Sequence, residues 1–471
     1  MMSFFSKNTM RSMTRRNRWR LLFTLSGTIL SALFATLAGC KPDEETPQPK
    51  PITLHVIGEA LPPVESLREL GKEFSRQYGV QIEVHPFEFE TALSKTLLDF
   101  SAGTGNYDVV YGIYFNLGKY VENKYILPFE PFMNDTTLRD PAVRLDNFFA
   151  PVVQVSCEYK GQLYGLPASA QTMFLWYRKD LFSHPSEQEA FAERYGYALP
   201  LPTAERAITW AQYRDLAEFF TRKKGATLAG EVLKQDMFGT CLQAKRHPAC
   251  WYEFGNYIAS FGGQVVNEQG DVVVDSPEVL EALEFYLSLR AFSPPGTTQY
   301  TWDDALTAVQ QGRVALTIMW FDATPSLEDA KASRVAGKMG YGLNPIRQGV
   351  EKRAAQYGGW GFYINADSKH PNEAFQFIQW LNRPDIQLKW AKIGGLPATL
   401  STYRDPEYLA IPFHRAERAS LEHLSAWTRA PYSEKIISKG ARAVSMAASG
   451  QTSPADALSQ LAKEIREIVS Q

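Results

Sequence analysis

Two cysteines and a histidine lie close together near the middle of the chain, and their side chains could form a disulfide or bind a metal ion. Cys241 and Cys250 are separated by eight residues, with His247 between them. A bridge between the two thiols would close a short loop and stabilise the fold by roughly 3 kcal/mol. Zinc binding by both thiols and His247 is the alternative, but the spacing matches no common zinc motif. We therefore predict a Cys241–Cys250 disulfide, no metal ion, and a small buried thiol at Cys157.

The chain lacks the short motifs that mark several large enzyme classes. It contains no Gly-x-Ser-x-Gly nucleophile elbow, no His-Glu-x-x-His zinc helix and no Gly-x-x-x-x-Gly-Lys phosphate loop. Its seven histidines are scattered without the spacing of metal ligands. A pair of carboxylates that cleaves a glycosidic bond leaves no such motif, so an exported glycoside hydrolase stays open as an alternative. The prediction is a protein that is not an enzyme and needs no cofactor.

Polar and aromatic residues follow short strands that alternate with helices after residue 51. The pattern predicts strands at 53–57, 81–87 and 107–111, with helices at 64–78 and 91–100 between them. Strands and helices in this order form a parallel sheet covered on both faces. Ligands of such sheets bind outside the carboxyl ends of the strands. Gly58-Glu59 and the segment 112–116, which contains Tyr114 and Phe115, are therefore candidate binding loops.

Helices and strands continue to alternate in the rest of the chain. We expect helices at 203–221, 278–290, 303–311 and 372–381, strands at 314–319 and 361–365, and a last helix that opens at Ser453-Pro454. Trp320, Phe321 and Asp322 directly follow one of these strands. The part of the chain after residue 39 is longer than one hydrophobic core usually organises, so two lobes are expected.

The first forty residues have the layout of an export signal. Six Lys and Arg residues precede Leu21 without an acidic residue, and a mostly apolar run extends to Ala38. The run ends at Leu37-Ala38-Gly39-Cys40, which resembles the lipobox of bacterial lipoproteins, where the cysteine is lipidated and becomes the mature N-terminus. A plain membrane anchor is the alternative, and Arg15-Arg16 leaves twin-arginine export open. We predict export and a lipid anchor on Cys40 in a bacterial membrane, with the protein facing the periplasm or the cell exterior.

The charge of the chain argues against one class of partner. Six of the 49 Lys and Arg residues precede Cys40, which leaves 43 against 51 Asp and Glu residues and a net charge near −8 in the mature chain. Phosphate binding requires concentrated positive charge, and no stretch rich in Lys or Arg remains. We therefore expect no nucleic-acid partner. Export also implies oxidising surroundings, in which disulfides persist.

Several short segments of the mature chain carry a family resemblance. They are Leu70 to Phe74, Tyr107 to Val110, Tyr159-Lys160-Gly161-Gln162-Leu163-Tyr164-Gly165-Leu166-Pro167, Leu175 to Phe182, Ala308 to Leu316, Phe362 to Leu381, and Ala447-Ala448-Ser449-Gly450. In this order they resemble the extracellular solute-binding proteins of ABC importers, specifically the maltose-binding-like, carbohydrate-associated group. The resemblance runs through nearly the whole mature chain and rests on the order of the segments, because each alone is weak.

The resemblance implies an α/β fold of the two-lobed periplasmic-binding-protein kind (type II-like). Each lobe would be a sheet covered by helices, and a hinge of several strands would join them. The implied domains are a signal peptide at 1–39, a polar tether at 40–51, lobe 1 at 52–165 continued by about 360–396, and lobe 2 at 166–359 continued by about 400–471. A monomer tethered by lipid beside an ABC permease is expected.

The resemblance also implies a ligand class and a binding site. A sugar, oligosaccharide or polyol offers C–H faces on which aromatic rings stack, and hydroxyls that carboxylates and amides bind. The candidate ligand-binding residues are Glu59, Tyr114, Phe115, Gln171, Trp251, Trp320, Asp322, Gly359 and Trp360. Ile437 stands where the family often has a further stacking aromatic, so the ligand is expected to differ from a long maltodextrin.

The implied function is that of a substrate-binding lipoprotein, which captures its ligand between the lobes and delivers it to the membrane permease. A binding protein that reports to a membrane sensor is the alternative. The sequence does not separate the two, because both use the same closure of the lobes on the ligand.

Overall fold

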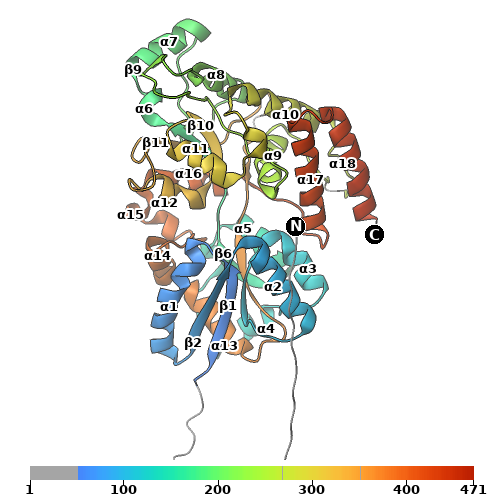
Figure 1. Cartoon of the computed structure of the whole chain (residues 1–471). Coiled ribbons are helices and arrows are strands. Elements are labelled where there is room, and N and C mark those ends of the chain that lie inside the picture. Colours follow the sequence, from blue (N-terminus) through green and yellow to red (C-terminus); the bar gives the residue numbers. More distant parts are fainter. Residues whose placement is uncertain (1–50, 268, 351, 471) are drawn as a thin grey trace, which may run out of the picture. The chain divides into compact units, whose positions relative to one another are not determined.

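The computed structural model describes residues 51–470 except 268 and 351. The predicted signal peptide, the lipidation site Cys40 and nearly all of the tether lie outside the described residues. The chain from Pro51 onward forms one compact unit, in which two main sheets, each with helices packed on it, form two lobes (Figure 1). None of the helices in the described part of the chain is both long and apolar enough to cross a membrane.

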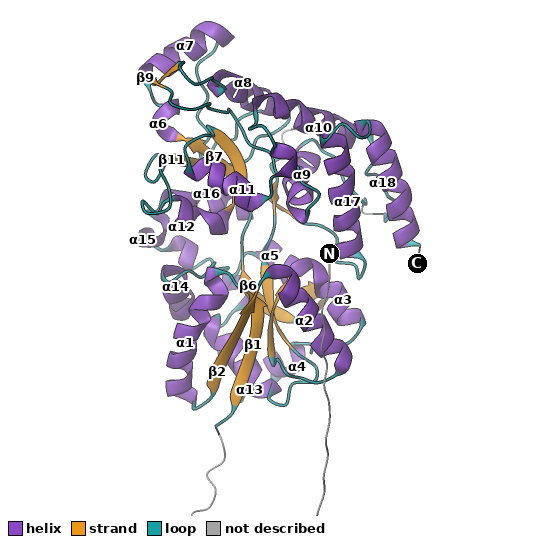
Figure 2. Ribbon diagram, in the orientation of Figure 1, coloured by secondary structure: helices purple, strands orange, loops and turns teal. Residues whose placement is uncertain are grey.

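The first lobe contains a five-stranded mixed sheet in the order β2-β1-β3-β13-β6 (Figure 2). Its strands are β1 (Thr53–Glu59), β2 (Gln81–Phe87), β3 (Val109–Ile113), β6 (Gly165–Ser169) and β13 (Trp360–Ile364). β1 pairs in parallel with β2 and β3, which confirms the predicted parallel unit. β13 runs antiparallel to β3 and β6, because the chain returns from the second lobe and enters this sheet at the end where β1 and β3 leave it.

Helices cover both faces of this sheet. They are α1 (Pro62–Tyr78), α2 (Phe89–Ala102), α3 (Leu117–Glu122), α4 (Glu130–Asn134), α5 (Ala150–Ser156), α13 (Pro371–Leu381) and α14 (Pro384–Lys392). α1 begins with proline, whose fixed φ suits the first turn of a helix, and it buries Val64, Leu67, Leu70 and Phe74. It ends at Gly79, where a φ of 72° favours glycine.

The second lobe is built on a three-stranded antiparallel sheet in the order β10-β7-β11. Its strands are β7 (Met173–Arg178), β10 (Leu316–Trp320) and β11 (Met339–Gly342). The helices between these strands are α6 (Lys179–Phe182), α7 (Pro185–Tyr195), α8 (Trp210–Phe220), α9 (Pro248–Ser260), α10 (Pro277–Ser288), α11 (Trp302–Gln310) and α12 (Thr324–Leu327). The helix predicted at 203–221 is shorter than expected, because the capping box of Thr209 and Gln212 starts it at Trp210.

The C-terminal part of the chain is mostly helical. It contains α15 (Pro406–Leu409), α16 (Pro412–Leu421), α17 (Ser433–Ala448) and α18 (Pro454–Val469). The predicted start of α18 is confirmed, since the hydroxyl of Ser453 accepts a hydrogen bond from the backbone N–H of Asp456 at 3.1 Å. α17 packs on α9 and α18. Short strand pairs complete the structure: β4 (Glu158–Tyr159) with β5 (Gln162–Leu163), β8 (Thr227–Leu228) with β9 (Glu231–Val232), and β12 (Ala355–Gln356) with β14 (Leu424–Ser425).

Three segments that link the lobes run beside one another. The first, 170–172, joins β6 to β7, the second, 357–359, leads into β13, and the third, 396–399, follows α14. The N–H of Ala170 donates to Leu396 O at 3.2 Å, and the N–H of Gly358 donates to Gln171 O at 2.9 Å. The first crossing comes after Ser169, because β6 itself pairs with β13 in the first sheet.

Candidate ligand-binding cleft

A cavity of about 310 Å³ lies beside the crossing segments and is lined from both lobes. The first lobe and the crossings contribute Glu59, Leu61, Pro62, Phe89, Ile113, Gln171, Gly358 and Trp360. The second lobe contributes Pro248, Tyr252, Trp302, Asp303, Leu306, Met319, Trp320, Asp322, Ala323 and Ser326. Several of these residues stand at the ends of β1, β3 and β10, where open α/β sheets place their ligands.

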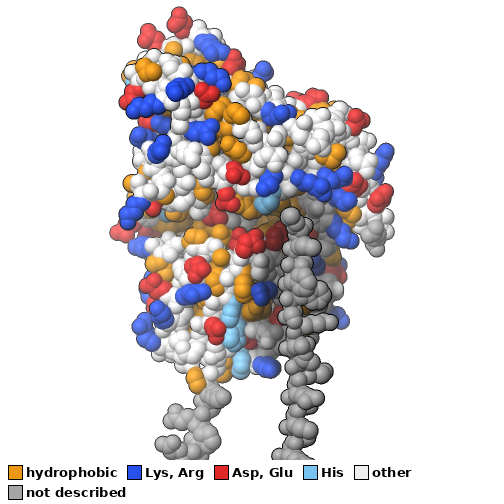
Figure 3. All heavy atoms as spheres, in the orientation of Figure 1, with side chains coloured by type: hydrophobic (Ala, Val, Ile, Leu, Met, Phe, Trp, Pro, Cys, Tyr) orange, Lys and Arg blue, Asp and Glu red, His pale blue; other side chains and the backbone are white. Residues whose placement is uncertain are grey.

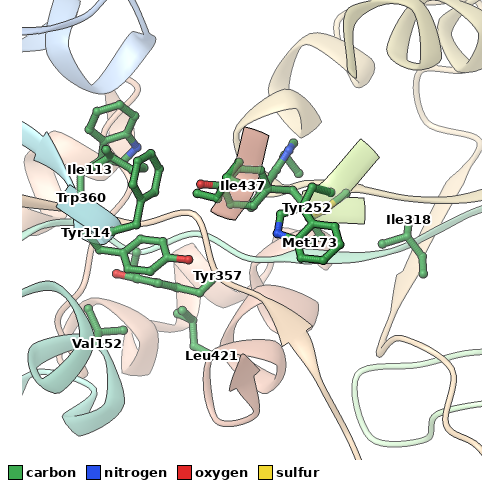
Figure 4. Close-up of a cluster of buried hydrophobic side chains, with 14 of the residues drawn as sticks. Ile113, Tyr114, Val152, Met173, Tyr252, Ile318, Tyr357, Trp360, Leu421 and Ile437 are labelled. Carbon is green, nitrogen blue, oxygen red and sulfur yellow. The ribbon is translucent and has the colours of Figure 1, made fainter. Parts of the chain in front are cut away.

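Aromatic rings from both lobes form the walls of the cavity. Trp360 stacks on Tyr111 with ring centroids 4.9 Å apart, and the edge of Phe89 meets it at 6.0 Å. Across the cleft, Tyr252 of α9 meets Trp320 at 5.6 Å. Figure 4 shows Trp360 and Ile113 on one side of the gap and Tyr252 on the other. The ring of Trp320 packs on the backbone of Gly358, since a Cβ at that position would lie 2.5 Å from the ring. Glycine is therefore required for this close approach.

Two buried polar atoms beside these rings have no hydrogen-bond partner among the described residues. They are the indole Nε1 of Trp360 and the side-chain Oε1 of Gln171. The amide nitrogen of Gln171 donates to Gly358 O at 3.2 Å, which fixes the side chain on the crossing segment. Buried polar groups in native proteins are nearly always paired. The lining of the cavity thus contains a buried indole N–H donor and a buried amide oxygen acceptor that the described residues leave unpaired.

Three carboxyl groups line the same cavity. Burial, together with the nearby charges of Asp322, Glu88 and Asp303, raises the pKa of Glu59 from 4.5 to about 8. Burial also raises the pKa of Asp322 to about 6, although the backbone amides of Asp322 and Ala323 lower it in part. At neutral pH the Glu59 carboxyl is therefore mostly protonated, and that of Asp322 is mostly ionised. Asp and Glu side chains gather near the boundary between the lobes in Figure 3.

Five of the candidate residues from the sequence line this cavity: Glu59, Gln171, Trp320, Asp322 and Trp360. The other four lie elsewhere. Tyr114 is fully buried, and its hydroxyl accepts a hydrogen bond from the backbone N–H of Trp427 at 3.0 Å. Trp251 is also fully buried and stacks on Trp427 at 4.9 Å. Phe115 lines a neighbouring cavity of about 400 Å³, which shares Phe89, Pro248 and Tyr252 with the first.

Gly359 has a structural role in the crossing. A Cβ at this position would lie 2.6 Å from Ser169 O and closer still to the hydroxyl of Tyr357. With a larger residue at position 359, the segment 357–359 could not lie this close to Ser169 at the end of β6.

The predicted disulfide is wrong, because Cys241 and Cys250 are both free, buried thiols, as is Cys157. Cys241 packs in an apolar cluster with Phe174 and Trp176, before α9 begins. Cys250 lies in the first turn of α9, and its Sγ contacts Ala441 O of α17 at 3.3 Å. His247 also has a structural role, since its Nδ1 accepts from the N–H of Ala249 and caps α9.

Among the aromatic and acidic lining residues, four were not predicted from the sequence: Phe89, Tyr252, Trp302 and Asp303. Phe89 comes two residues after the end of β2 and begins α2, so the rule that singled out Glu59 at the end of β1 also applies to it. Tyr252 is the helical neighbour of Trp251. Adjacent helical side chains point about 100° apart. The pair Trp251-Tyr252 therefore indicates that α9 places an aromatic ring in the cavity, but the sequence does not show which of the two rings it is.

Comparisons with known proteins agree with this geometry. A family described as bacterial extracellular solute-binding protein matches residues 69–412. A probable amino-acid ABC transporter periplasmic-binding protein of Sinorhizobium fredii is 23% identical over 350 residues, which cover 73% of this chain and 72% of that protein. A mannitol-binding protein of Pseudomonas aeruginosa is 28% identical over 287 residues, 58% of each chain.

Among solved structures, a solute-binding protein of an ABC transporter from Agrobacterium radiobacter, in complex with ribitol, is similar to this chain. It has a TM-score of 0.74 and 26% identity, and the match covers 88% of this chain and 98% of that one. The two-lobed α/β fold expected from the sequence is thereby confirmed.

Proposed function

Because the chain belongs to the family of bacterial extracellular solute-binding proteins, we propose that it captures a polyol, sugar or short oligosaccharide in the cleft between its lobes. The captured solute is then delivered to the membrane permease of an ABC importer. The names of its relatives support this proposal, since they include an ABC transporter binding protein, a mannitol-binding protein and a protein solved with ribitol.

The observation that carries the proposal is the pairing of aromatic walls with unpartnered polar atoms in one cavity. Trp320, Trp360 and Tyr252 offer apolar ring surfaces to the C–H groups of a polyol or sugar. The Nε1 of Trp360 and Oε1 of Gln171 would bind two of its hydroxyls. The ionised carboxylate of Asp322 would accept a third hydrogen bond, of the stronger charge-assisted kind.

The size and charge of the cavity narrow the ligand class. Ligand pockets range from about 300 to 1,000 Å³, so a cavity of about 310 Å³ suits a small solute. Glu59, Asp303 and Asp322 are the carboxylic acids of its lining, and no Lys or Arg is among the described lining residues. The carboxylate of a free amino acid would find no cationic partner there and would face three acidic groups. A neutral polyhydroxylated solute fits better.

A thermal-shift screen of polyols, monosaccharides, short oligosaccharides and amino acids tests the ligand class. A ligand that binds only the folded protein stabilises it by about 2.7 kcal/mol at a hundred times its Kd. We expect at least one polyol or sugar to raise the melting temperature in a concentration-dependent way. Stabilisation by amino acids alone would contradict the proposal.

Catalysis is tested with an oligosaccharide that the thermal-shift screen identifies as a ligand. Glu59 and Asp322, which have different raised pKa values, are the pair that a glycoside hydrolase would use as acid and nucleophile. Incubation of the protein with a bound oligosaccharide, followed by chromatography of the sugar, should return it unchanged. Hydrolysis would make this chain an enzyme.

We propose further that the protein is a lipoprotein, tethered by lipid on Cys40 and held near its permease as a monomer. Cys40 closes an apolar segment and is followed by the polar segment 41–51, which would set the reach of the tether. Replacing Cys40 with alanine should leave ligand binding unchanged and release the protein from membranes or leave it unprocessed. Fractionation of the variant with membranes in a shorter, processed form would contradict lipidation.

Normal uptake of the ligand in a deletion strain, with a lost transcriptional response, would favour a sensor partner over a permease.

A further inference from the structure

Three side chains at the edge of the first sheet point toward one another, away from the ligand-binding cleft. The Nδ1 of His55 lies 3.1 Å from the Nε2 of His85. The Glu83 carboxylate has one oxygen 3.6 Å from the His55 nitrogen and the other 3.6 Å from the His85 nitrogen. One ligand atom from each of the three residues thus lies within 4.8 Å of the other two. In Figure 3, His side chains gather on the surface of the first lobe over β1 and β2.

The parallel pairing of β1 with β2 creates this arrangement. His55 of β1 stands directly opposite Glu83 of β2, and His85 lies two residues further along β2. Because side chains two residues apart on a strand point to the same face, all three project from one side of the sheet. β2 is the edge strand of the sheet. The spacing is invisible in the sequence, where His55 is 28 residues from Glu83.

We propose that His55, Glu83 and His85 bind a divalent transition-metal ion of the Zn²⁺ type. Zinc bonds to imidazole nitrogens and carboxylate oxygens are about 2.0–2.2 Å long, which places the ligand atoms of a tetrahedral site about 3.2–3.6 Å apart. Here the two imidazole nitrogens are 3.1 Å apart, and each lies 3.6 Å from a different oxygen of the Glu83 carboxylate, close to that range. A hydrogen bond between the two imidazoles accounts for the first distance only, because 3.6 Å is too long for a hydrogen bond to the carboxylate.

The neighbours of the three residues hold them in place. The backbone N–H of His55 donates to Asp108 Oδ2 at 2.9 Å, and Asp108 Oδ1 accepts from the hydroxyl of Ser368 at 2.6 Å. The ring of Tyr107 meets that of His85 edge to face at 5.5 Å. The side chains of His55 and Glu83 are 36% and 59% exposed, so a metal ion can enter from solvent and keep a fourth position for water.

The site is separate from the ligand-binding cleft. His55 precedes Glu59 by four residues along β1, which corresponds to about 13 Å at the rise of a strand. Two imidazoles with one carboxylate are donors that suit Zn²⁺, Ni²⁺ and Cu²⁺ better than Mg²⁺ or Ca²⁺. A bound ion would link the edge strand β2 to β1 and so stabilise the first lobe, since binding to the folded state alone stabilises it.

The test is calorimetric titration of ZnCl₂ into the full chain, purified without a polyhistidine tag and stripped with EDTA. We expect one saturable zinc site per chain, with no comparable heat from MgCl₂. The variants H55Q, E83Q and H85Q should each weaken zinc binding at least about tenfold, since even groups that only support a metal ligand contribute that much. Cobalt(II) should give the strong visible absorption of a four-coordinate site in the parent protein and lose it in the variants.

H184Q is the matched control, because His184 is a half-buried histidine of the second lobe whose Nδ1 pairs with Ser186. It should bind zinc like the parent protein. Melting in EDTA shows whether each variant folds, and zinc should raise the melting temperature of the parent protein but not of H85Q. The absence of saturable zinc binding, or zinc binding that is unchanged in all three variants, would overturn the proposal and leave a simple His55–His85 hydrogen bond.

Discussion

Replacing Trp360 with alanine is expected to weaken binding of the solute by about 1–3 kcal/mol, or roughly 5- to 150-fold in Kd. The substitution removes a ring that lies against Tyr111 and Phe89 and an indole N–H that has no partner of its own among the described residues. Trp320→Ala should have an effect of the same size, because its ring forms the opposite wall with Tyr252. Isothermal titration of the solute identified by thermal shift measures both changes.

Two further variants separate the ring from its N–H group. Trp360→Phe keeps an aromatic ring beside Tyr111 but removes the donor, and it should cost about 0.5–1.5 kcal/mol of binding, the value of one neutral hydrogen bond. Trp390→Phe is the control, because Trp390 donates to Pro63 O and Ser66 Oγ inside the first lobe and does not line the cavity. It should reduce stability without changing Kd. Unchanged affinity in both alanine variants would remove the cleft assignment.

The part of the site that could be predicted from the sequence lies at the ends of strands. Glu59 ends β1, Trp320 ends β10 and Trp360 begins β13, and such positions face the crevice of an α/β sheet whatever the detailed packing. The alternation of strands and helices likewise determined the parallel pairing of the first three strands. These features depend on local periodicity and chain order, which a sequence displays directly.

The residues that sequence reasoning missed depend on packing between distant segments. Whether Trp251 or Tyr252 faces the cleft is decided by how α9 rotates against α17, where Trp251 lies on Gly440. The absence of a Cys241–Cys250 bridge has the same origin. Loop length favours closure, but a disulfide also needs Cβ atoms about 3.5–4.5 Å apart and directed at each other. Cys250 instead contacts α17, a helix that begins 183 residues later in the chain.

The second large effect is expected on folding stability, which should depend on pH through the protonation of Glu59. Its folded-state pKa of about 8 lies above the ordinary value of 4.5, so between these values the folded protein binds more protons than the unfolded chain. Stability therefore falls as pH rises from 4.5 to 8, and the full penalty is present above 8. Glu59→Gln removes the ionisable group, so we expect the variant to be more stable than the parent protein at pH 9 by at least about 1 kcal/mol. At pH 4.5 the two proteins should melt alike.

The affinity for the solute should also depend on whether Glu59 is protonated. Below pH 8 the Glu59 carboxyl is neutral and can both donate and accept a hydrogen bond, as the amide of glutamine does. Glu59→Gln should therefore bind the solute with nearly parental affinity at pH 6. The affinity of the parent protein should decline above pH 8, where a neutral ligand would have to displace water from the ionised carboxylates of both Glu59 and Asp322, whereas that of the variant should stay level.

Asp322, in contrast to Glu59, should bind the solute as a carboxylate, because its pKa of about 6 leaves it ionised at neutral pH. Asp322→Asn replaces a charged acceptor by a neutral one and should weaken binding at pH 7.5 by about 1.5–3 kcal/mol, the value of a hydrogen bond to a charged group. At pH 5 the Asp322 carboxyl of the parent protein is itself protonated, so the difference between the two proteins should shrink. Equal affinities of the parent protein and the asparagine variant at pH 7.5 would mean that Asp322 does not contact the solute. A large loss of affinity in Glu59→Gln at pH 6 would mean that Glu59 binds the solute as a carboxylate. The solute would then carry a positive charge and would not be a neutral polyol or sugar.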